Sequence, residues 1–399
     1  MAAVDFDPFS PGFFEDPYPV YRMLRDAAPV YHNPRYGFWA LSRFDDVLAA
    51  HQDWRTFSSA HGVTLHDLCN PDFRSSGILI YLDPPEHERL RKLVSKVFTP
   101  RAVAGLEPAI RAIVRRTLDR VAGARRFDAV ADFAALFPVE VISVLLGVPA
   151  ADRQAVRLRA DLALHREPHD PAPTAAGIEA AIEQFRYFLA LVEDKRRHPG
   201  DDLVSRLCAA ELPDTQGTQR LSDVEIASFA SLLGAAGSET VTKLVGNGVV
   251  LFHRHRGEWA KVVADPAAIP RAVEEILRYW APSQYQGRFT TAAAHVHGVT
   301  IPAGVPVLLL TGAASRDERA YPDPDRFDID RRQQIPLGFG YGIHSCLGAA
   351  LARLESRIAF EELRERYPRF AVEEGGLRRV QMSNVAGFSH VPILAEGSA

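Results

Sequence analysis

Residues 336–348 read Pro-Leu-Gly-Phe-Gly-Tyr-Gly-Ile-His-Ser-Cys-Leu-Gly. Their glycines remove side-chain bulk, so the backbone can approach a large, flat partner closely. Cys346 comes directly before a run of strong helix formers that begins at Leu347. A thiol at the start of a helix is favoured in its anionic form by the backbone N–H groups and the helix dipole. This stretch therefore predicts a thiolate that is presented on a glycine loop.

A thiolate against a bulky planar partner is what haem iron requires as its proximal ligand. Two other interpretations of Cys346 stay open. A cysteine that follows glycines can be a small residue of the core. A zinc site would need several ligands, and only His344 is close in sequence, while Cys69 and Cys208 each stand alone.

The loop resembles the cysteine loop of the cytochrome P450 family, F-x-x-G-x-x-x-C-x-G. Phe339, Gly342, Cys346 and Gly348 occupy its four fixed positions. The resemblance implies a bound haem b (iron protoporphyrin IX) with Cys346 as the iron ligand. It also implies that Phe339, Gly340 and Gly348 lie beside the cofactor.

Composition and charge exclude several classes of protein. The chain has 399 residues, of which 47% are hydrophobic and 24% charged, as in soluble globular proteins with a substantial core. Its 46 basic and 50 acidic residues argue against nucleic-acid binding. Three cysteines cannot all pair, and the N-terminal stretch lacks the apolar span of a signal peptide or membrane anchor. We expect a cytoplasmic protein without membrane attachment, and within the cytochrome P450 family it resembles the bacterial type.

A second motif lies at the start of a predicted helix. His87 and Arg91 are four residues apart, after Asp83-Pro84-Pro85, and so project from one helix face. Alone, such a pair is typical of a solvated surface. It matches the H-x-x-x-R motif of the cytochrome P450 family, which implies that both side chains bind haem propionates. The resemblance assigns the same role to Arg288 and to His344.

The third motif lies inside a long apolar helix that Ser222-Asp223-Val224-Glu225 opens as a capping box. An acid and a threonine, Glu239 and Thr240, are costly to bury there unless they have a use. With Ala236 and Gly237 they match the family's A/G-G-x-D/E-T, which lies over the haem. The resemblance implies that Gly237 makes room for dioxygen and that Glu239 and Thr240 deliver protons. Alternatively, Thr240 only bonds back to a helical carbonyl.

Glu275 and Arg278 form an E-x-x-R motif on a predicted helix at 272–280, where the two side chains can pair. Surface pairs of this kind are common and weak. In the family the motif pairs with a downstream arginine and supports the surroundings of the cysteine loop, so its role is structural. Arg326 and Arg331 are the candidates for the partner, and Arg326 is preferred.

Elsewhere the sequence predicts mostly helices. Helices are expected at 19–27 and 44–50, a strand at 38–41, and an almost wholly helical stretch at 101–210. Residues 58–80 lack periodicity and are expected to form a long loop, either a wall or lid of a pocket or a plain surface excursion. The Pro-rich stretch 167–173 cannot be helical. The resemblance makes it a hinge in the roof of the pocket.

The expected fold is mainly α with a small β region, one cytochrome P450 domain over residues 1–399 around a buried haem. No fused reductase or ferredoxin is expected. The resemblance also implies a mostly apolar substrate pocket with a few polar side chains that could read a substrate. The expected pocket residues are Leu233, Ala236, Gln284, Tyr285, Val385 and Phe388.

The expected activity is that of a haem-thiolate monooxygenase, which activates dioxygen and hydroxylates or epoxidises a small, mostly apolar organic molecule. Electrons are expected from a ferredoxin and a ferredoxin reductase, because a basic face near the cysteine suits an acidic partner. The residues of that face are Arg89, Lys92, Lys96, Arg101 and Arg353. Two alternatives stay open: a haem-thiolate enzyme for peroxide-driven oxidation or oxidative coupling, against which Glu239 and Thr240 count, and a non-catalytic haem-binding or sensor protein.

Overall fold

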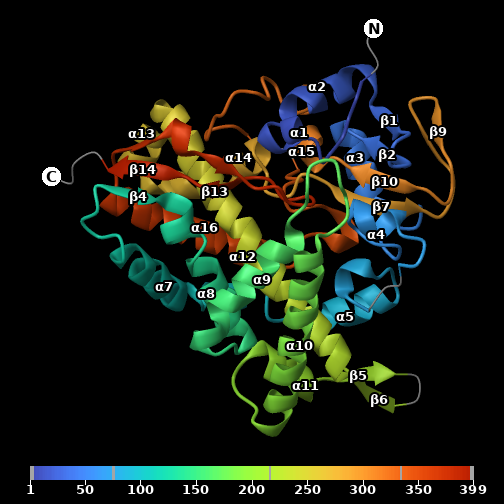
Figure 1. Ribbon diagram of the computed structural model, residues 1–399, viewed down its shortest axis with the longest axis horizontal. Coiled ribbons are helices and arrows are strands. Elements are labelled where there is room, and N and C mark those ends of the chain that lie inside the picture. Colours follow the sequence, from blue (N-terminus) through green and yellow to red (C-terminus); the bar gives the residue numbers. More distant parts are fainter. Residues whose placement is uncertain (1–3, 74–76, 215–216, 333–334, 396–399) are drawn as a thin grey trace.

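The longest helix, α12 (Asp223–Arg254), runs through the middle of the computed structural model, and the other elements pack around it (Figure 1). The structure describes residues 4–73, 77–214, 217–332 and 335–395. The Ser222 hydroxyl accepts a hydrogen bond from the Glu225 N–H, and the Glu225 carboxylate accepts one from the Ser222 N–H. The predicted capping box and long helix are both confirmed.

Most of the described chain is helical, as predicted. The other α-helices are α1 (Pro11–Glu15), α2 (Tyr18–Ala27), α3 (Phe44–Gln52), α4 (Leu65–Cys69), α5 (Glu86–Val94), α6 (Pro100–Ala104), α7 (Glu107–Asp119), α8 (Phe137–Leu146), α9 (Arg153–Leu164), α10 (Ala175–Arg197), α11 (Leu203–Ala209), α13 (Arg256–Ala264), α14 (Ile269–Tyr279), α15 (Thr311–Ala314) and α16 (Ala349–Arg366). Shorter helical turns are η1 (Leu79–Tyr81), η2 (Ala129–Ala134), η3 (Ala150–Asp152), η4 (Pro266–Ala268), η5 (Gly342–His344) and η6 (Glu374–Gly376). The helices predicted at 19–27 and 44–50 are confirmed as α2 and α3.

One five-stranded sheet lies beside α2 and α3, at one edge of the molecule (Figure 1). Its order is β1 (Val30–Asn33), β2 (Phe38–Leu41), β10 (Pro306–Leu309), β7 (Gln286–Thr290) and β3 (Phe57–Ser58). β2 and β10 run parallel, and the other neighbouring pairs are antiparallel. β2 is the strand predicted at 38–41. The sheet carries Arg288, on β7, into the interior.

The remaining strands form small sheets. β4 (Arg126–Asp128), β14 (Pro392–Ala395) and β11 (Phe370–Val372) make one, and the hairpins are β5 (Glu211–Asp214) with β6 (Gly217–Arg220), β8 (Ala294–Val296) with β9 (Val299–Ile301), and β12 (Arg378–Arg379) with β13 (Phe388–His390). β4 corrects the expectation of an almost wholly helical 101–210. A three-residue strand is too short to show a period in the sequence, and its pairing with the distant β14 exists only in the folded chain.

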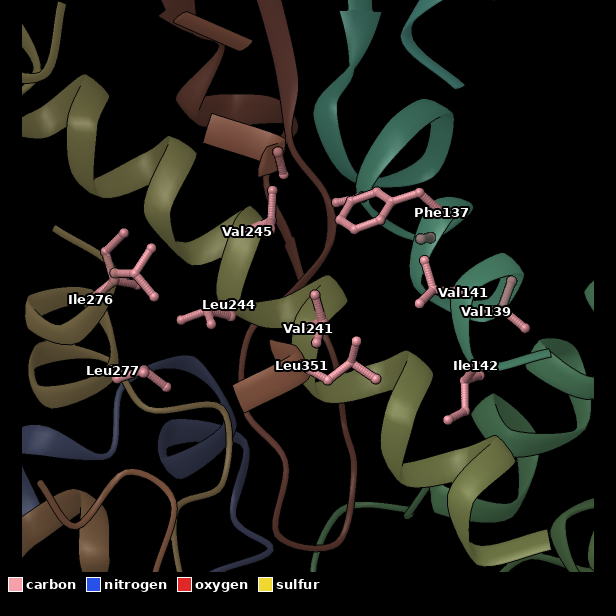
Figure 2. Close-up of a cluster of buried hydrophobic side chains, with 14 of the residues drawn as sticks. Phe137, Val139, Val141, Ile142, Val241, Leu244, Val245, Ile276, Leu277 and Leu351 are labelled. Atoms are coloured by element: carbon pink, nitrogen blue, oxygen red, sulfur yellow. The ribbon is translucent and has the colours of Figure 1, made fainter. Parts of the chain in front are cut away.

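Aliphatic side chains bury α12 on several sides (Figure 2). Val241 of α12 lies close to Leu351 of α16, while Leu244 faces Ile276 on α14 (Figure 2). Full burial of such a side chain is worth roughly 1.5–3 kcal/mol. This packing holds α16, the helix that follows Cys346, against the turn of α12 that carries Thr240.

One segment, Ala129–Leu146, is long and apolar enough to cross a membrane by length and composition, and 67% of it is buried. The segment comprises η2 and α8, and both pack against α12. Its hydrophobicity is that of a helix in the protein core.

The prediction of a long loop at 58–80 is wrong in part. α4 lies inside it, and Thr64 caps this helix with Asp67 as the partner of a capping box. A helix of five residues is too short for apolar periodicity to reveal it. α4 packs against β7 and β10, so the segment covers one side of the sheet. Residues 74–76 lie outside the described ranges.

The connection between α9 and α10 is non-helical, as predicted, and is fastened to the N-terminal region. The His169 N–H donates to the carbonyl of Phe9 (2.7 Å), and the His169 ring lies 2.6 Å from the Asp7 carboxylate. The Tyr36 hydroxyl donates to the His169 carbonyl (3.0 Å). Figure 1 shows this green connection rising from the two helices toward the N-terminal elements. A hinge function for it stays a prediction.

Candidate active site

Cys346 lies at the end of a loop that closes on itself. The Cys346 N–H donates to the carbonyl of Phe339 (2.8 Å), and α16 starts three residues later, at Ala349. Gly342 has a φ of +70°, and a Cβ there would lie 2.2 Å from the carbonyl oxygen of His51. A residue with a side chain at 342 would therefore displace α3 from the loop.

The environment of the Cys346 thiol opposes its ionisation. Cys346 keeps solvent-exposed surface, but the protein atoms around its sulfur raise the pKa of the thiol above the ordinary value, although the Gly348 N–H and the cations of Arg91 and Arg353 act in the opposite direction. The argument that the helix start favours the anion is thus outweighed by desolvation. A coordinating metal ion would reverse this balance, because a thiol that binds a metal is deprotonated.

Three buried side chains near this loop, His51, His87 and Arg288, and the partly buried His344 have no counter-charge within 4 Å among the described residues. The rings of His87 (α5) and His344 (η5) lie 4.4 Å apart. Arg288 (β7) is close enough to lower the pKa of both His344 and His51 (α3). Both ring nitrogens of His51 and His87, and Nε2 of His344, have no hydrogen-bond partner. Buried donors without acceptors are costly, so the cluster indicates an anionic ligand.

These imidazoles are neutral at pH 7. Burial, reinforced by Arg288, lowers the pKa of His51 to about 3. Burial, reinforced by Arg91, lowers the pKa of His87 to about 4. Burial also lowers the pKa of Arg288 to about 10, so its guanidinium stays charged. One cation and several N–H donors suit two carboxylates, and the residues therefore fit the propionates of a haem.

His51 was missing from the sequence prediction. In α3 it follows Val47 and Ala50 and looks like an ordinary helical residue. It belongs to the cluster only because the sheet and the loop at Gly342 close over α3. Arg91, which was predicted, donates to the carbonyl and hydroxyl of Ser345 and so ties α5 to the residue before Cys346.

On α12, Thr240 forms a hydrogen bond back to a helical carbonyl, as the alternative interpretation of this residue predicted. Its hydroxyl donates to the carbonyl of Ala236 (2.9 Å). The hydroxyl oxygen keeps a lone pair that can accept another proton donor. Gly237 faces α8, since a Cβ there would lie 2.9 Å from Cγ1 of Ile142. Its missing side chain is thus required by helix packing, and a role in making room for dioxygen stays a prediction.

Glu239 is buried and forms an ion pair with Lys243 (2.7 Å), one turn further along α12. Burial by itself would raise the pKa of Glu239, but Lys243 and the neighbouring Asp161 hold it below the ordinary value. Asp161, on α9, accepts a hydrogen bond from Arg157 Nη1 (2.7 Å). Burial and Glu239 nevertheless raise the pKa of Asp161 to about 8, although Lys243 and Arg157 act in the opposite direction. At neutral pH Asp161 therefore carries a proton beside the Glu239 carboxylate.

Sequence reasoning did not find Asp161 or Lys243. Lys243 carried a readable signal, because it is four residues after Glu239 on one predicted helix. Asp161 had none, since only the packing of α9 against α12 brings it to Glu239.

The E-x-x-R motif forms a buried hub. Both oxygens of Glu275 accept hydrogen bonds from Arg278, at 2.7 and 2.8 Å. The downstream partner is Arg331, whose Nε donates to Glu275 at 3.3 Å. The preference for Arg326 was wrong: its guanidinium is exposed and lies 3.7 Å from Asp328.

Two of the expected pocket residues are buried. Gln284 is 1% exposed and its amide donates to the Ala281 carbonyl at 2.6 Å. Tyr285 is 0% exposed and its hydroxyl donates to the Ser383 carbonyl at 2.6 Å. The Gln284 amide N–H and the Tyr285 hydroxyl thus donate to backbone carbonyls, while Gln284 Oε1 is buried without a hydrogen-bond partner. A substrate contact by either residue stays a prediction.

The other expected pocket residues lie on two elements. Leu233 and Ala236 lie one turn apart on α12, and Ala236 keeps exposed surface. Val385 belongs to a small apolar cluster, and Phe388 is buried under the guanidinium of Arg379 (4.1 Å from the ring centroid). A pocket role for these residues stays a prediction.

The sequence and fold were compared with known proteins. The family described as Cytochrome P450 matches residues 268–388. Cytochrome P450 123 of Mycobacterium bovis is 44% identical over 393 residues, which are 97% of this chain and 96% of that relative. Erythromycin C-12 hydroxylase of Saccharopolyspora erythraea is 38% identical over 386 residues, 94% of this chain and 93% of that one.

Solved structures agree with these relatives. A mutant of P450 EryK in complex with erythromycin B superposes with a TM-score of 0.88 and 37% identity, over 96% of this chain and 97% of that chain. Similarity of this extent, together with the cysteine loop and the anion-binding cluster, establishes the fold and the cofactor. This chain belongs to the cytochrome P450 family, as a monooxygenase that binds haem b.

Proposed function

We propose that this cytochrome P450 uses Cys346 as its iron ligand and hydroxylates or epoxidises a small, mostly apolar organic molecule. The observation that carries the proposal is the closed cysteine loop beside buried donors that have no acceptor. When bound, the haem supplies the activation of dioxygen and the transfer of one oxygen atom to the substrate. The chain's own residues hold the cofactor, position the substrate and deliver protons.

The cofactor would be held at both ends. His51, His87 and His344 would bind the propionates through ring nitrogens that have no partner, and Arg288 would do so as a buried cation without a carboxylate within 4 Å among the described residues. Phe339, Gly340 and Gly348 frame the cysteine on the loop, where Gly340 has a φ of +65°. Arg91 contributes through Ser345, by fixing the residue before Cys346.

Protons would reach the pocket through three side chains. Asp161 holds a proton at neutral pH, and Lys243 keeps Glu239 anionic and ready to accept it. Thr240, the next residue, presents its hydroxyl oxygen and can pass a proton on after it turns away from the Ala236 carbonyl. The retained acid–alcohol pair supports oxygen insertion over a peroxide-driven or coupling reaction.

Electrons would come from a ferredoxin that is reduced by a ferredoxin reductase. Of the five cations of the expected basic face, Arg353 is paired with Glu274, and Arg89 lies 3.6 Å from Glu225. The exposed side chains of Lys92, Lys96 and Arg101 have no carboxylate within 4 Å among the described residues. These three therefore form the docking face that we propose. The three free cysteines are consistent with action in the cytoplasm.

The test is the spectrum of the reduced protein with carbon monoxide. The wild-type protein should show the Soret band of a thiolate-bound complex, and Cys346→Ser should lose it. Cys69→Ser is the matched control and should keep the band. A Cys346→Ser protein that retains the band would overturn the assignment.

Labelled dioxygen separates the monooxygenase reaction from the alternatives. With a ferredoxin, its reductase and a substrate, one labelled oxygen atom should appear in the product. Oxidation that proceeds only with peroxide, or leaves no label in the product, would favour the peroxide-driven or coupling enzyme.

A further inference from the structure

Arg166 is a buried cation without a counter-ion. It lies in the connection between α9 and α10 and is 5% exposed. Six lysines and arginines are buried in the described part of the chain, and four of them have a carboxylate within 4 Å. The four pairs are Arg25–Glu318, Lys243–Glu239, Arg278–Glu275 and Arg316–Asp325. The two unpaired cations are Arg288 and Arg166.

Arg288 and Arg166 differ in what can neutralise them. Arg288 lies among the histidines that are proposed to hold the haem propionates, so the cofactor supplies its anion. Arg166 is on the connection above α12 and has no such group. A guanidinium keeps its charge even when buried, and a buried, unpaired charge is costly. The cost at Arg166 would be removed by an anion that arrives with a ligand.

The hydrogen bonds of Arg166 leave one side of the guanidinium free. Nε donates to the Pro171 carbonyl (3.0 Å), and Nη1 donates to the carbonyls of Ala163 (2.9 Å) and His165 (2.7 Å). Nη2 has no acceptor among the described residues and is not fully buried, so a ligand atom can reach it. Carbonyl oxygens orient the group, but they do not neutralise its charge.

The backbone next to Arg166 borders a buried apolar cluster. The Arg166 N–H donates to the Gln381 carbonyl (2.9 Å), and His165 forms a β-bridge with Met382. Leu164 packs on the cluster of Val380, Met382 and Val385. The connection that carries Arg166 thus adjoins apolar side chains that include one of the expected pocket residues, Val385.

The charge around Arg166 selects the kind of anion. Burial lowers the pKa of Arg166, and Tyr285, Asp67 and Asp170 oppose this shift by their charge, yet neither aspartate carboxylate lies within 4 Å of the guanidinium. A dianion such as a phosphate monoester would be repelled by both aspartates. A single negative charge on a planar group matches one guanidinium edge.

We propose that Arg166 binds the carboxylate of an amphipathic substrate, whose apolar body lies along Leu164, Met382 and Val385 toward α12. The inference rests on the proposed function, because it names the class of substrate for that pocket. An apolar acid is the substrate, and Arg166 is the specificity-determining residue.

The experiment compares acids with their uncharged esters. Octanoate, dodecanoate and palmitate, each beside its methyl ester, are titrated into the ferric haem protein. Binding is followed by the Soret shift and independently by calorimetry. At least one acid should bind about tenfold or more tightly than its ester, since a hydrogen bond to a charged group is worth that much. Added sodium chloride should lower the affinity for the acid and leave the affinity for the ester unchanged.

Arg166→Gln keeps a donor for the neighbouring carbonyls and removes the charge. The variant should lose about tenfold to hundredfold in affinity for the acid and nothing for the ester. Arg35→Gln is the matched control. Arg35 is exposed and donates to the His169 carbonyl of the same connection (3.4 Å), so this variant perturbs the connection without touching the buried charge. It should keep the wild-type preference.

Two results overturn the inference: wild-type protein that binds every acid and its ester equally, or Arg166→Gln that weakens both to the same extent. If Arg166→Gln does not fold, the wild-type ratio and its salt dependence still decide. If the wild-type protein shows the thiolate Soret band but binds acids and esters with equal affinity, the proposed function stands and this inference is wrong. Loss of that band in the wild-type protein removes the proposed function itself.

Discussion

At the scale of the residue, Glu355 shows what burial alone does to an acid. It lies on α16, is 1% exposed, and its Oε2 has no hydrogen-bond partner. Burial raises its pKa well above the ordinary value, with no nearby charge to offset the effect. The folded protein therefore holds Glu355 protonated at pH values where the unfolded chain ionises it.

Glu355→Gln should stabilise the protein at neutral and alkaline pH. The raised pKa makes the wild-type free energy of unfolding fall as pH rises above about 4.3, the ordinary value for glutamate, until the folded-state pKa is reached. The amide does not ionise, so the variant should have a Tm a few degrees higher at pH 8. Each kcal/mol of added free energy of unfolding raises Tm by roughly 2–4 °C. The two proteins should converge near pH 4 in thermal melts. Glu365→Gln, an exposed change on the same helix, should match wild type throughout.

Asp161→Asn should slow proton delivery without weakening substrate binding. The amide keeps the shape of the side chain but supplies no proton to Glu239, so kcat should fall about tenfold to hundredfold. Because the pKa of Asp161 is raised to about 8, wild-type kcat should decline as pH rises through that value, and the variant should lack this limb. Glu183→Gln, which alters another acid near α9, should retain the wild-type profile. Identical pH profiles for wild type and Asp161→Asn would contradict the relay.

At the scale of the element, α12 depends on close approach by its neighbours. Gly237 lies against Ile142 of α8, whereas Gly257 of α13 has nothing within 4 Å of its Cβ position. Both positions are helical, so the two glycines differ mainly in the space around them.

Gly237→Ala and Gly257→Ala should change stability in different ways. Both gain helix propensity, up to about 1 kcal/mol. Only Gly237→Ala forces Ile142 to move, and overpacking costs about 1–3 kcal/mol. The free energies of unfolding from urea titration should differ by about that amount, with Gly257→Ala the more stable. Equal stabilisation by both would show that α8 moves away without cost.

The hub at Glu275 joins α14 to the segment that follows residue 321. Arg331→Ala should destabilise the protein by about 3 kcal/mol or more. The change removes the bond to Glu275 and the bonds that Arg331 donates to the carbonyls of Pro322, Asp323 and Arg326. Arg326→Ala should stay within about 0.5 kcal/mol, because its guanidinium is exposed. Denaturant titrations that rank the two variants in the opposite order would restore Arg326 as the partner.

At the scale of the whole molecule, the surface charge is distributed unevenly around a net charge of −4. Three exposed cations without a carboxylate within 4 Å among the described residues lie along the chain from α5 to α6, next to the cysteine loop: Lys92, Lys96 and Arg101. Long-range attraction between such a face and an acidic partner raises the association rate and weakens with salt.

Charge reversal on this face should act on the partner and leave the substrate site unchanged. Lys92→Glu with Lys96→Glu should raise the KM for an acidic ferredoxin at least about tenfold and flatten its salt dependence. Substrate affinity, from the Soret shift, should not change. Arg186→Glu, an exposed reversal on α10, should behave as wild type. A wild-type KM in the double variant would show that the ferredoxin docks on another face of the protein.

The sequence alone determined the features that repeat or cluster locally: the cysteine loop, the capped central helix, the E-x-x-R pair, the strand at 38–41 and the mainly α class. These depend on spacing within a few residues, where backbone geometry fixes which side chains meet.

Only the tertiary structure decided which distant side chains share an environment. It brought His51 to the anion-binding cluster, Asp161 to Glu239 and Arg331 to Glu275, and it turned Gln284 and Tyr285 toward the protein. It also left Arg166 buried without a carboxylate. The physical reason is that burial and charge pairing depend on what packs around a group, and those neighbours come from segments that are far apart in the chain.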